Sequence, residues 1–308
     1  MNKTKKQIKA RIGESLGYYQ GFPMGTYMEV LDAQRQEKVN SARTSSLLLT
    51  EFWQPANLGR IEKALSKYLG NLDLESALKF FEFGTPPMEG KRKLGRSSMT
   101  DLMILENDYQ IADEAKFTEY VWGPSQTLNG WYTDPEGADR LLRRRVAKVW
   151  LEMIQNAGCT DITSVKELFS RCGDIGYQFF HRTASACHTT NWKDCKSAVL
   201  LYQLFYKAGD EKYVAKMNEF KSQLKEWAKA LGLKNMKFLI VCVPVVNDDE
   251  IEERFGKMRG RECARLFETM KLEEIYKFDF GGIEVEDVML PVDEEYRKRY
   301  LEIKEVRR

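Results

Sequence analysis

Two strand-like segments joined by a short turn place the strongest constraint on how this 308-residue chain can fold. Residues 98–106 and 109–118 are rich in strand-forming residues, and Asn107-Asp108 between them suits a two-residue turn. These features predict a β-hairpin. With this turn, the two strands pair in a register that places Asp101 directly opposite Glu114.

One face of the predicted hairpin carries three charged residues. Directly opposed strand residues have Cβ atoms roughly 4.5–5.5 Å apart, so the carboxylates of Asp101 and Glu114 would repel each other unless a cation lies between them. Because side chains alternate along a strand, Lys116 points to the same face as Glu114. The predicted site therefore contains two carboxylates and one amine.

This combination fits a metal-dependent hydrolase. Mg²⁺ prefers oxygen ligands and retains several waters, so two carboxylates and a substrate phosphate suit it, and Mn²⁺ could substitute. Lys116 could orient or help to deprotonate the attacking water, and could offset the developing negative charge. We therefore predict Asp101, Glu114 and Lys116 as catalytic residues, with Asp101 and Glu114 as metal ligands.

The alternative is an exposed hairpin whose charges form an ordinary surface ion pair. The apolar runs at residues 102–105 and 111–112 indicate strands that are buried on both faces. Charged residues beside such strands are harder to explain as surface residues, which favours a functional site.

At these residues the sequence resembles a known group. Thr100-Asp101 and Glu114-Ala115-Lys116 resemble the motif of the PD-(D/E)XK nucleases, which have a restriction-endonuclease-like fold. Thr100 stands where the name of the motif has proline. The resemblance implies a core in the order helix, three strands, helix, strand. It also implies that Asp101 and Glu114 bind metal and that Lys116 assists catalysis.

The resemblance also implies further site residues. Members often add an acidic ligand from the helix before the first strand, and we prefer Glu51 to Glu62 because a carboxylate among apolar neighbours needs a partner if it points inward. Gln203 is a further candidate because Tyr202-Gln203-Leu204 resembles a glutamine–tyrosine signature of some members. Its spacing to Tyr206 is shorter than in that signature.

The remaining pattern predicts an α/β protein in which a mixed central sheet is flanked by helices, with helical N-terminal and insertion elements. Three regions follow: a helical N-terminal region over 1–75, a nuclease core over 76–246 with a helical insertion at about 121–192, and a C-terminal extension over 247–308 packed on the core. The individual elements are predicted by apolar periodicity and by breakers. Helices are expected at 41–53, 58–69, 138–157, 193–208, 210–231 and 248–272, and further strands at 77–83, 236–245 and 275–280.

The overall charge does not identify a partner, because the formal net charge is only +2. Basic residues are nevertheless clustered locally, and in a nuclease such clusters could hold phosphates. The alternative is a solvated helix face. The candidate nucleic-acid-binding residues are Lys91, Arg92, Lys93, Arg143, Arg144, Arg145 and Lys148.

One segment concentrates residues that can bind metals: Cys159, Cys172, His181, Cys187, His188 and Cys195. Structural Zn²⁺ sites usually contain closely paired ligands, and this spacing is absent, so buried free thiols are the favoured interpretation and structural Zn²⁺ the alternative. Free thiols suit a reducing compartment. The longest apolar run, residues 238–246, is too short to span a bilayer, so we expect no membrane association and a cytoplasmic protein.

The sequence thus predicts a metal-dependent DNA endonuclease that hydrolyses phosphodiester bonds, of the restriction type or associated with phage. A DNA repair or recombination nuclease is the nearest alternative. A catalytically inactive nucleic-acid-binding protein of the same fold and a zinc-organised interaction module are the rivals from other classes. A homodimer is a further expectation, because cutting both DNA strands often needs two active sites.

Overall fold

The computed structural model describes most of the chain between residues 43 and 289. The described residues are 17–19, 22–24, 29–30, 33, 43–106, 108–117, 120, 126–133, 140–188, 197–260, 262–263 and 275–289. Asn107 of the predicted turn and Cys195 of the cysteine-rich segment lie outside them.

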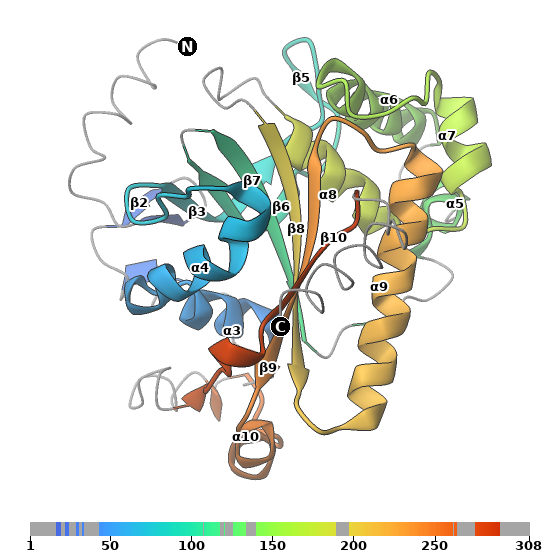
Figure 1. Cartoon of the computed structure of the whole chain (residues 1–308). Helices are drawn as coiled ribbons and strands as arrows, with labels where there is room; N and C mark the ends of the chain where they lie inside the picture. The colour runs from blue at the N-terminus through green and yellow to red at the C-terminus, as the bar shows by residue number, and fades with distance from the viewer. Residues whose placement is uncertain are drawn as a thin grey trace, which may run out of the picture.

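A mixed eight-stranded sheet forms the centre of the molecule, in the order β10-β9-β8-β7-β6-β3-β1-β2 (Figure 1). Its strands are β1 (Gly17–Tyr19), β2 (Phe22–Met24), β3 (Leu78–Thr85), β6 (Ser98–Leu105), β7 (Tyr109–Lys116), β8 (Ser197–Lys207), β9 (Lys237–Val245) and β10 (Glu284–Asp287). Strands β7, β8 and β9 are parallel to one another, and β1 is parallel to β3. The other neighbouring pairs are antiparallel.

Helices cover both faces of the sheet. In Figure 1, α3 and α4 lie on one side of the strands and α8 and α9 on the other. The helices are α3 (Ser45–Phe52), α4 (Leu58–Leu69), α5 (Leu128–Thr133), α6 (Arg140–Asn156), α7 (Val165–Cys172), α8 (Tyr177–Cys187), α9 (Glu211–Leu231) and α10 (Asp248–Phe255). Two short 3₁₀ turns, Pro55–Asn57 and Phe280–Gly282, and a small hairpin of β4 (Met88–Glu89) and β5 (Arg92–Lys93) complete the description.

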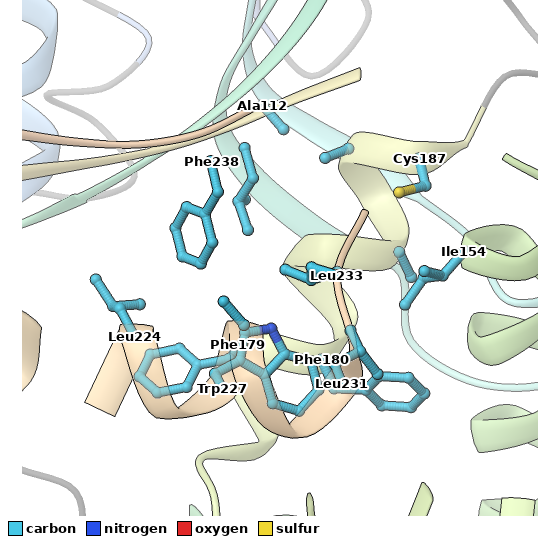
Figure 2. Close-up of a cluster of buried hydrophobic side chains, with 14 of the residues drawn as sticks. Ala112, Ile154, Phe179, Phe180, Cys187, Leu224, Trp227, Leu231, Leu233 and Phe238 are labelled. Carbon is cyan, nitrogen blue, oxygen red and sulfur yellow. The ribbon is translucent and has the colours of Figure 1, made fainter. Parts of the chain in front are cut away.

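Each face of the sheet buries its own hydrophobic core. Phe179, Phe180 and Trp227 bring α8 and α9 against Phe238 of β9 and Ala112 of β7 (Figure 2). On the opposite face, residues of α3 and α4 pack against strand residues such as Ile104 of β6, Ile111 of β7 and Leu201 of β8. Because successive strand side chains point to opposite faces, this division tells us which side of the sheet each site residue occupies.

The predicted hairpin and its register are confirmed in the described residues. Strands β6 and β7 pair antiparallel, with Ile104 opposite Ile111 and Leu102 opposite Asp113. Asp101 and Glu114 are the next residues beyond this last pair. The turn itself includes Asn107, which lies outside the described residues, but the Glu106 amide donates to the Tyr109 carbonyl across it at 3.0 Å.

Most of the other predicted elements are also confirmed, with ends shifted by a few residues. Helices α3, α4, α6 and α9 and strands β3 and β9 lie where the pattern placed them. Helix α9 ends at Gly232, which adopts a left-handed backbone (φ 61°) that glycine accommodates without strain.

The helix predicted over residues 193–208 is wrong, because residues 197–207 form strand β8. The segment is rich in leucine, and a continuous apolar run cannot be assigned to helix or strand from periodicity alone. Pairing decides its conformation: β8 lies between β7 and β9 and forms parallel ladders with both. Gln203 therefore lies on a central strand.

The strand predicted over residues 275–280 is reduced to an isolated antiparallel bridge between Phe278 and Val245. Phe278 and Phe280 instead pack their rings against Phe52 of α3, each with a centroid separation of 5.5 Å. The strand that pairs with the outer edge of β9 is β10, the acidic segment Glu284–Asp287. Lys221 and Lys225 of α9 form ion pairs with Glu286, which offsets the low strand preference of acidic residues.

The segment predicted as an insertion, about 121–192, contains helix α8, which contacts β6, β7 and β8 directly. Residues of α6, α7 and α8 belong to the same hydrophobic core as the sheet. This segment therefore helps to build the central core. None of the helices in the described part of the chain has the length and apolar character needed to cross a membrane.

Candidate functional site

Asp101 stands near the end of the hairpin where β6 and β7 part. Its Oδ2 accepts a hydrogen bond from the Ala115 amide at 3.0 Å, so the side chain reaches across to the neighbouring strand. Burial and the charge of Glu114 raise the pKa of Asp101 to about 7, although Lys116 and Arg182 partly oppose the shift. This carboxylate is therefore held where its negative charge is costly.

Glu114 is buried and surrounded by donors. Its Oε1 accepts from Lys116 Nζ at 2.8 Å, from Gln178 Nε2 at 2.7 Å and from Arg182 Nη2 at 3.3 Å. Its Oε2 forms an ion pair with Arg182 Nε. Burial alone would raise the pKa of Glu114, but the positive charges of Arg182 and Lys116 outweigh it and hold the pKa below its ordinary value. Glu114 is thus ionised at neutral pH.

Lys116 points to the same face as Glu114 and is itself buried. Burial would lower the pKa of Lys116, but the charges of Glu114 and Asp101 outweigh this effect and leave the pKa above its ordinary value. The amine is therefore protonated, and its chemistry in this state is that of a positive charge and a hydrogen-bond donor. A protonated amine cannot remove a proton from water.

A third carboxylate lies beside this pair. The strand pairs Phe81–Leu102 and Phe83–Thr100 place Glu82 of β3 across from Asp101. The charge of Glu82 contributes to the raised pKa of Asp101. Glu82 has a left-handed backbone with φ 52°, which is uncommon for a residue other than glycine and is often found where a fold holds a functional site.

Polar contacts fix helix α8 over this face of the hairpin. Gln110 of β7 donates to the carbonyls of Ala186 and His188 at 2.8 and 3.1 Å, which satisfies acceptors at the C-terminal end of the helix. The Ser185 hydroxyl lies 2.8 Å from that of Thr100, the residue in the proline position of the motif. Trp227 of α9 donates to Thr183 at 3.0 Å. These contacts position Gln178 and Arg182 against Glu114.

The opposite face of the sheet carries a separate buried polar group. Trp53 Nε1 donates both to Asp113 Oδ2 at 3.0 Å and to Gln203 Oε1 at 2.9 Å. Burial and the charge of Asp101 raise the pKa of Asp113 well above its ordinary value, and the hydrogen bond from Trp53 offsets this only in part. Gln203, the candidate from sequence, therefore belongs to this group and not to the Glu114 face.

Glu51 also lies on this opposite face. It is buried in α3 and accepts a hydrogen bond from Gln54. Burial raises the pKa of the neighbouring Tyr276 well above its ordinary value, and the charges of Cys263 and Glu51 add to this effect. Glu62, the other acidic candidate, accepts from the Leu74 amide at 2.7 Å. The structure brings Asp101, Glu114 and Lys116 together but does not bring Glu51 to them.

The two basic clusters predicted from sequence meet on the surface. Arg145 of α6 forms an ion pair with Glu89 of the β4–β5 hairpin. The hydrogen bond from Arg145 lowers the pKa of Glu89, and the charges of Arg145, Lys148 and Arg92 add to this effect. The exposed members of this basic surface are Lys91, Arg92, Lys93, Arg144 and Lys148. Arg143 does not belong to it, because it is buried and donates to the Trp131 carbonyl.

The cysteine-rich segment contains thiols in the core. Cys159, Cys172 and Cys187 are buried thiols. His181 lies 2.8 Å from the Ser98 hydroxyl through Nδ1. Burial and the charges of Arg182 and Lys116 lower the pKa of His181 well below its ordinary value, so its ring is neutral.

The site offers oxygen ligands of the kind that hard divalent cations take. Among the described residues, no group of three or more His, Cys, Asp or Glu side chains is arranged to hold a metal ion. Asp101 and Glu114 remain as a pair, and Mg²⁺ is commonly held by only one or two carboxylates together with waters and substrate phosphates. The pair fits this requirement, provided that Glu114 exchanges one of its present contacts.

Sequence reasoning missed Arg182, Gln178 and Glu82. Arg182 follows Phe179 and Phe180 on an apolar helix, where a charged side chain needs a partner if it points inward. Glu82 interrupts an aromatic strand in the same way. In both cases the available signal was a charged residue inside an apolar segment.

The architecture is that of an α/β protein with a mixed sheet between two layers of helices. The chain belongs to the family described as Domain of unknown function (DUF6946), which matches residues 27–260. The matched part contains Asp101, Glu114, Lys116 and Arg182. No curated protein and no solved structure matches the chain.

Proposed function

We propose that this protein is a metal-dependent nuclease that hydrolyses phosphodiester bonds in DNA, built on a restriction-endonuclease-like core. The observation that carries the proposal is the grouping of Asp101, Glu114 and Lys116 at one end of β6 and β7, where Asp101 accepts from the Ala115 amide and Glu114 accepts from Lys116. The order of elements supports it: α4 precedes β3, β6 and β7, which are followed by helices and then β8. This is the order helix, three strands, helix, strand that the resemblance implies.

The proposed reaction is the attack of water on a phosphodiester. A bound Mg²⁺ would supply a hydroxide near neutral pH and stabilise charge on the phosphoryl oxygens. Asp101 and Glu114 would hold this cation. Lys116, protonated beside them, would offset the negative charge that develops at phosphorus. The raised pKa of Lys116 favours this electrostatic role over that of a general base.

Cleavage assays test this proposal. The full chain is incubated with supercoiled plasmid or single-stranded DNA in Mg²⁺ or Mn²⁺, beside Asp101→Ala, Lys116→Ala and the control Asp73→Ala at an exposed carboxylate. We expect cleavage by the wild type and the control, and a loss of roughly 10²–10³-fold in rate in both site variants. Chelation of the metal should stop cleavage. Equal cleavage by all four proteins would reject the catalytic assignment.

The basic surface supports DNA as the substrate. It surrounds the β4–β5 hairpin, which lies between β3 and β6 in the chain. Strand β6 begins at Ser98, and Ser98 accepts a hydrogen bond at 3.0 Å from Arg182, which also contacts Glu114. The basic surface thus adjoins the end of the sheet that carries the site. Exposed arginine and lysine side chains there could contact the phosphates that flank a scissile bond.

Charge reversal tests this surface. The double variant Arg92→Glu/Arg144→Glu is expected to weaken binding to single-stranded DNA about tenfold or more at moderate salt, because phosphate contacts dominate affinity. Fluorescence anisotropy without divalent metal measures binding in the absence of cleavage. Lys63→Glu, at an exposed lysine of α4, is the control and should bind like the wild type. If the double variant and the control bind equally, the basic surface is not the binding face.

A second candidate function is nucleic-acid binding without catalysis. The observation that favours it is that Lys116 and Arg182 pair with Glu114 and offset the charge of one of the two carboxylates. Binding that is lost on charge reversal, together with no cleavage in either metal, would select this function over the nuclease.

A further inference from the structure

The two oxygens of Glu114 are occupied unequally. A carboxylate offers about four acceptor positions on its two oxygens. Three donors converge on Oε1: Lys116 Nζ, Gln178 Nε2 and Arg182 Nη2. Oε2 has no hydrogen-bond donor among the described residues and meets only Arg182 Nε, as an ion pair without hydrogen-bond geometry. Oε2 is therefore a buried anionic oxygen with incomplete satisfaction.

We propose that Arg182 is a counterion that competes with the divalent cation for Glu114. Its guanidinium occupies Oε2 in the metal-free protein, and it becomes available to a substrate phosphate once a cation has taken that oxygen. This inference rests on the proposed nuclease function, because it deepens the account of the same site. Arg182 is on this proposal a positioning residue that sets metal affinity.

The contacts distinguish Arg182 from the other cation of the site. Lys116 reaches Oε1 alone, so its departure would not free Oε2. Arg182 is the contact of Oε2, and its Nη1 has a second partner in Ser98 Oγ at 3.0 Å. Arg182 is carried by α8, whereas Asp101 and Glu114 are carried by the strands of the hairpin.

Electrostatics gives the exchange its direction. In the metal-free protein, the charges of Lys116 and Arg182 offset in part those of Asp101, Glu114 and the neighbouring Glu82. A dication placed on Oε2 supplies the charge that Arg182 now supplies, and repels the guanidinium. Substrate phosphate then offers Arg182 a new anionic partner, which a guanidinium can bind through two parallel hydrogen bonds.

Calorimetric titration of the full chain with Mn²⁺, without nucleic acid, measures this competition. Arg182→Met preserves length without charge and is expected to bind Mn²⁺ about tenfold more tightly than the wild type. Arg182→Lys keeps a charge but loses the fork that spans both oxygens, so it should bind more tightly by about threefold. Arg171→Met removes the arginine of an exposed ion pair with Asp161 outside the site and is the matched control, with a change within about twofold.

A second titration, with inorganic phosphate added to the Mn²⁺-loaded protein, tests the destination of Arg182. Arg182→Met should bind phosphate several-fold more weakly than the wild type, although it binds Mn²⁺ more tightly. Altered packing alone would not move the two affinities in opposite directions. Arg171→Met should leave the phosphate affinity unchanged.

Unchanged or weaker Mn²⁺ binding in both Arg182 variants would overturn the competition, as would a wild type that binds no Mn²⁺. If Arg182→Met does not fold, the comparison of Arg182→Lys with wild type decides alone, because that variant retains a buried positive charge. The titrations use no cleavage. Failure of the nuclease assignment would instead appear as a wild type that shows the expected order of Mn²⁺ affinities and cleaves no DNA.

Discussion

Replacing Glu114 with alanine is expected to lower the free energy of unfolding by about 3–5 kcal/mol, because it leaves buried cations without their partner. Arg182 and Lys116 both contact this carboxylate, and all three side chains are at most 10% exposed. Urea unfolding of the purified variant at neutral pH measures the change. The double variant Glu114→Leu/Arg182→Met should recover much of the loss, because it removes the anion and one cation together.

The matched control is the surface ion pair between Glu89 and Arg145, whose side chains are 46% and 39% exposed. Glu89→Ala should lower the free energy of unfolding far less than Glu114→Ala does, because solvent screens exposed pairs. A loss of similar size in Glu89→Ala and Glu114→Ala would show that Glu114 is not the buried partner described here. A double variant that is less stable than Glu114→Ala would lead to the same conclusion.

Replacing Asp101 with asparagine is expected to stabilise the protein at about pH 8, by up to about 4 kcal/mol. The folded-state pKa of Asp101 is about 7, above the ordinary value of 3.8, so the folded protein binds this proton more tightly than the unfolded chain. Stability from this group is present at low pH and is lost as pH rises between these two values. Asparagine is neutral throughout and keeps an oxygen that can accept the Ala115 amide.

The pH profile provides the control for this prediction. At about pH 4 the wild type and Asp101→Asn should have similar melting temperatures, since Asp101 is then largely protonated in the folded protein. Asp73→Asn should show no such gain at alkaline pH, because hydrogen bonds from Ser76 lower the pKa of Asp73. Calorimetric scans across this range measure both variants. A stability difference at Asp101 that is independent of pH would contradict the raised pKa.

Added Mg²⁺ separates metal binding from simple burial. If Asp101 helps to hold the cation, saturating Mg²⁺ should raise the melting temperature of the wild type at about pH 8, because a ligand that binds only the folded state stabilises it. Asp101→Asn should gain less, since it has lost one carboxylate. Equal gains in both proteins would remove Asp101 from the metal site while leaving the pKa argument intact.

The part of the site that local pattern determines was predictable from sequence. The hairpin of β6 and β7 is formed by segments that are neighbours in the chain. The length of the turn between them sets the register, and the register places Asp101 and Glu114 next to each other. Alternation then fixes the side of Lys116. Strand β8 was not predictable in this way, because its conformation depends on parallel pairing with β7 and β9, which lie far away in sequence.

The residues that complete the site come from long-range packing. Arg182 contacts Glu114 only because α8 is fixed over the hairpin by hydrogen bonds through Gln110 and Ser185. A helical pattern shows which face of α8 is apolar, but not which strand it covers. For the same reason the sequence suggested Glu51, whereas the residue near α3 that reaches the hairpin is Trp53, on the opposite face.

The register of the hairpin also limits which sequence changes this protein can accept during evolution. Asp113 and Glu114 are adjacent acids on opposite faces of the sheet, so a slip by one residue would exchange their sides and carry Lys116 away from α8. Loop tips usually accept added residues. Between Glu106 and Tyr109, by contrast, substitutions can be tolerated but insertions and deletions cannot, since the length of the turn decides which acid faces Arg182.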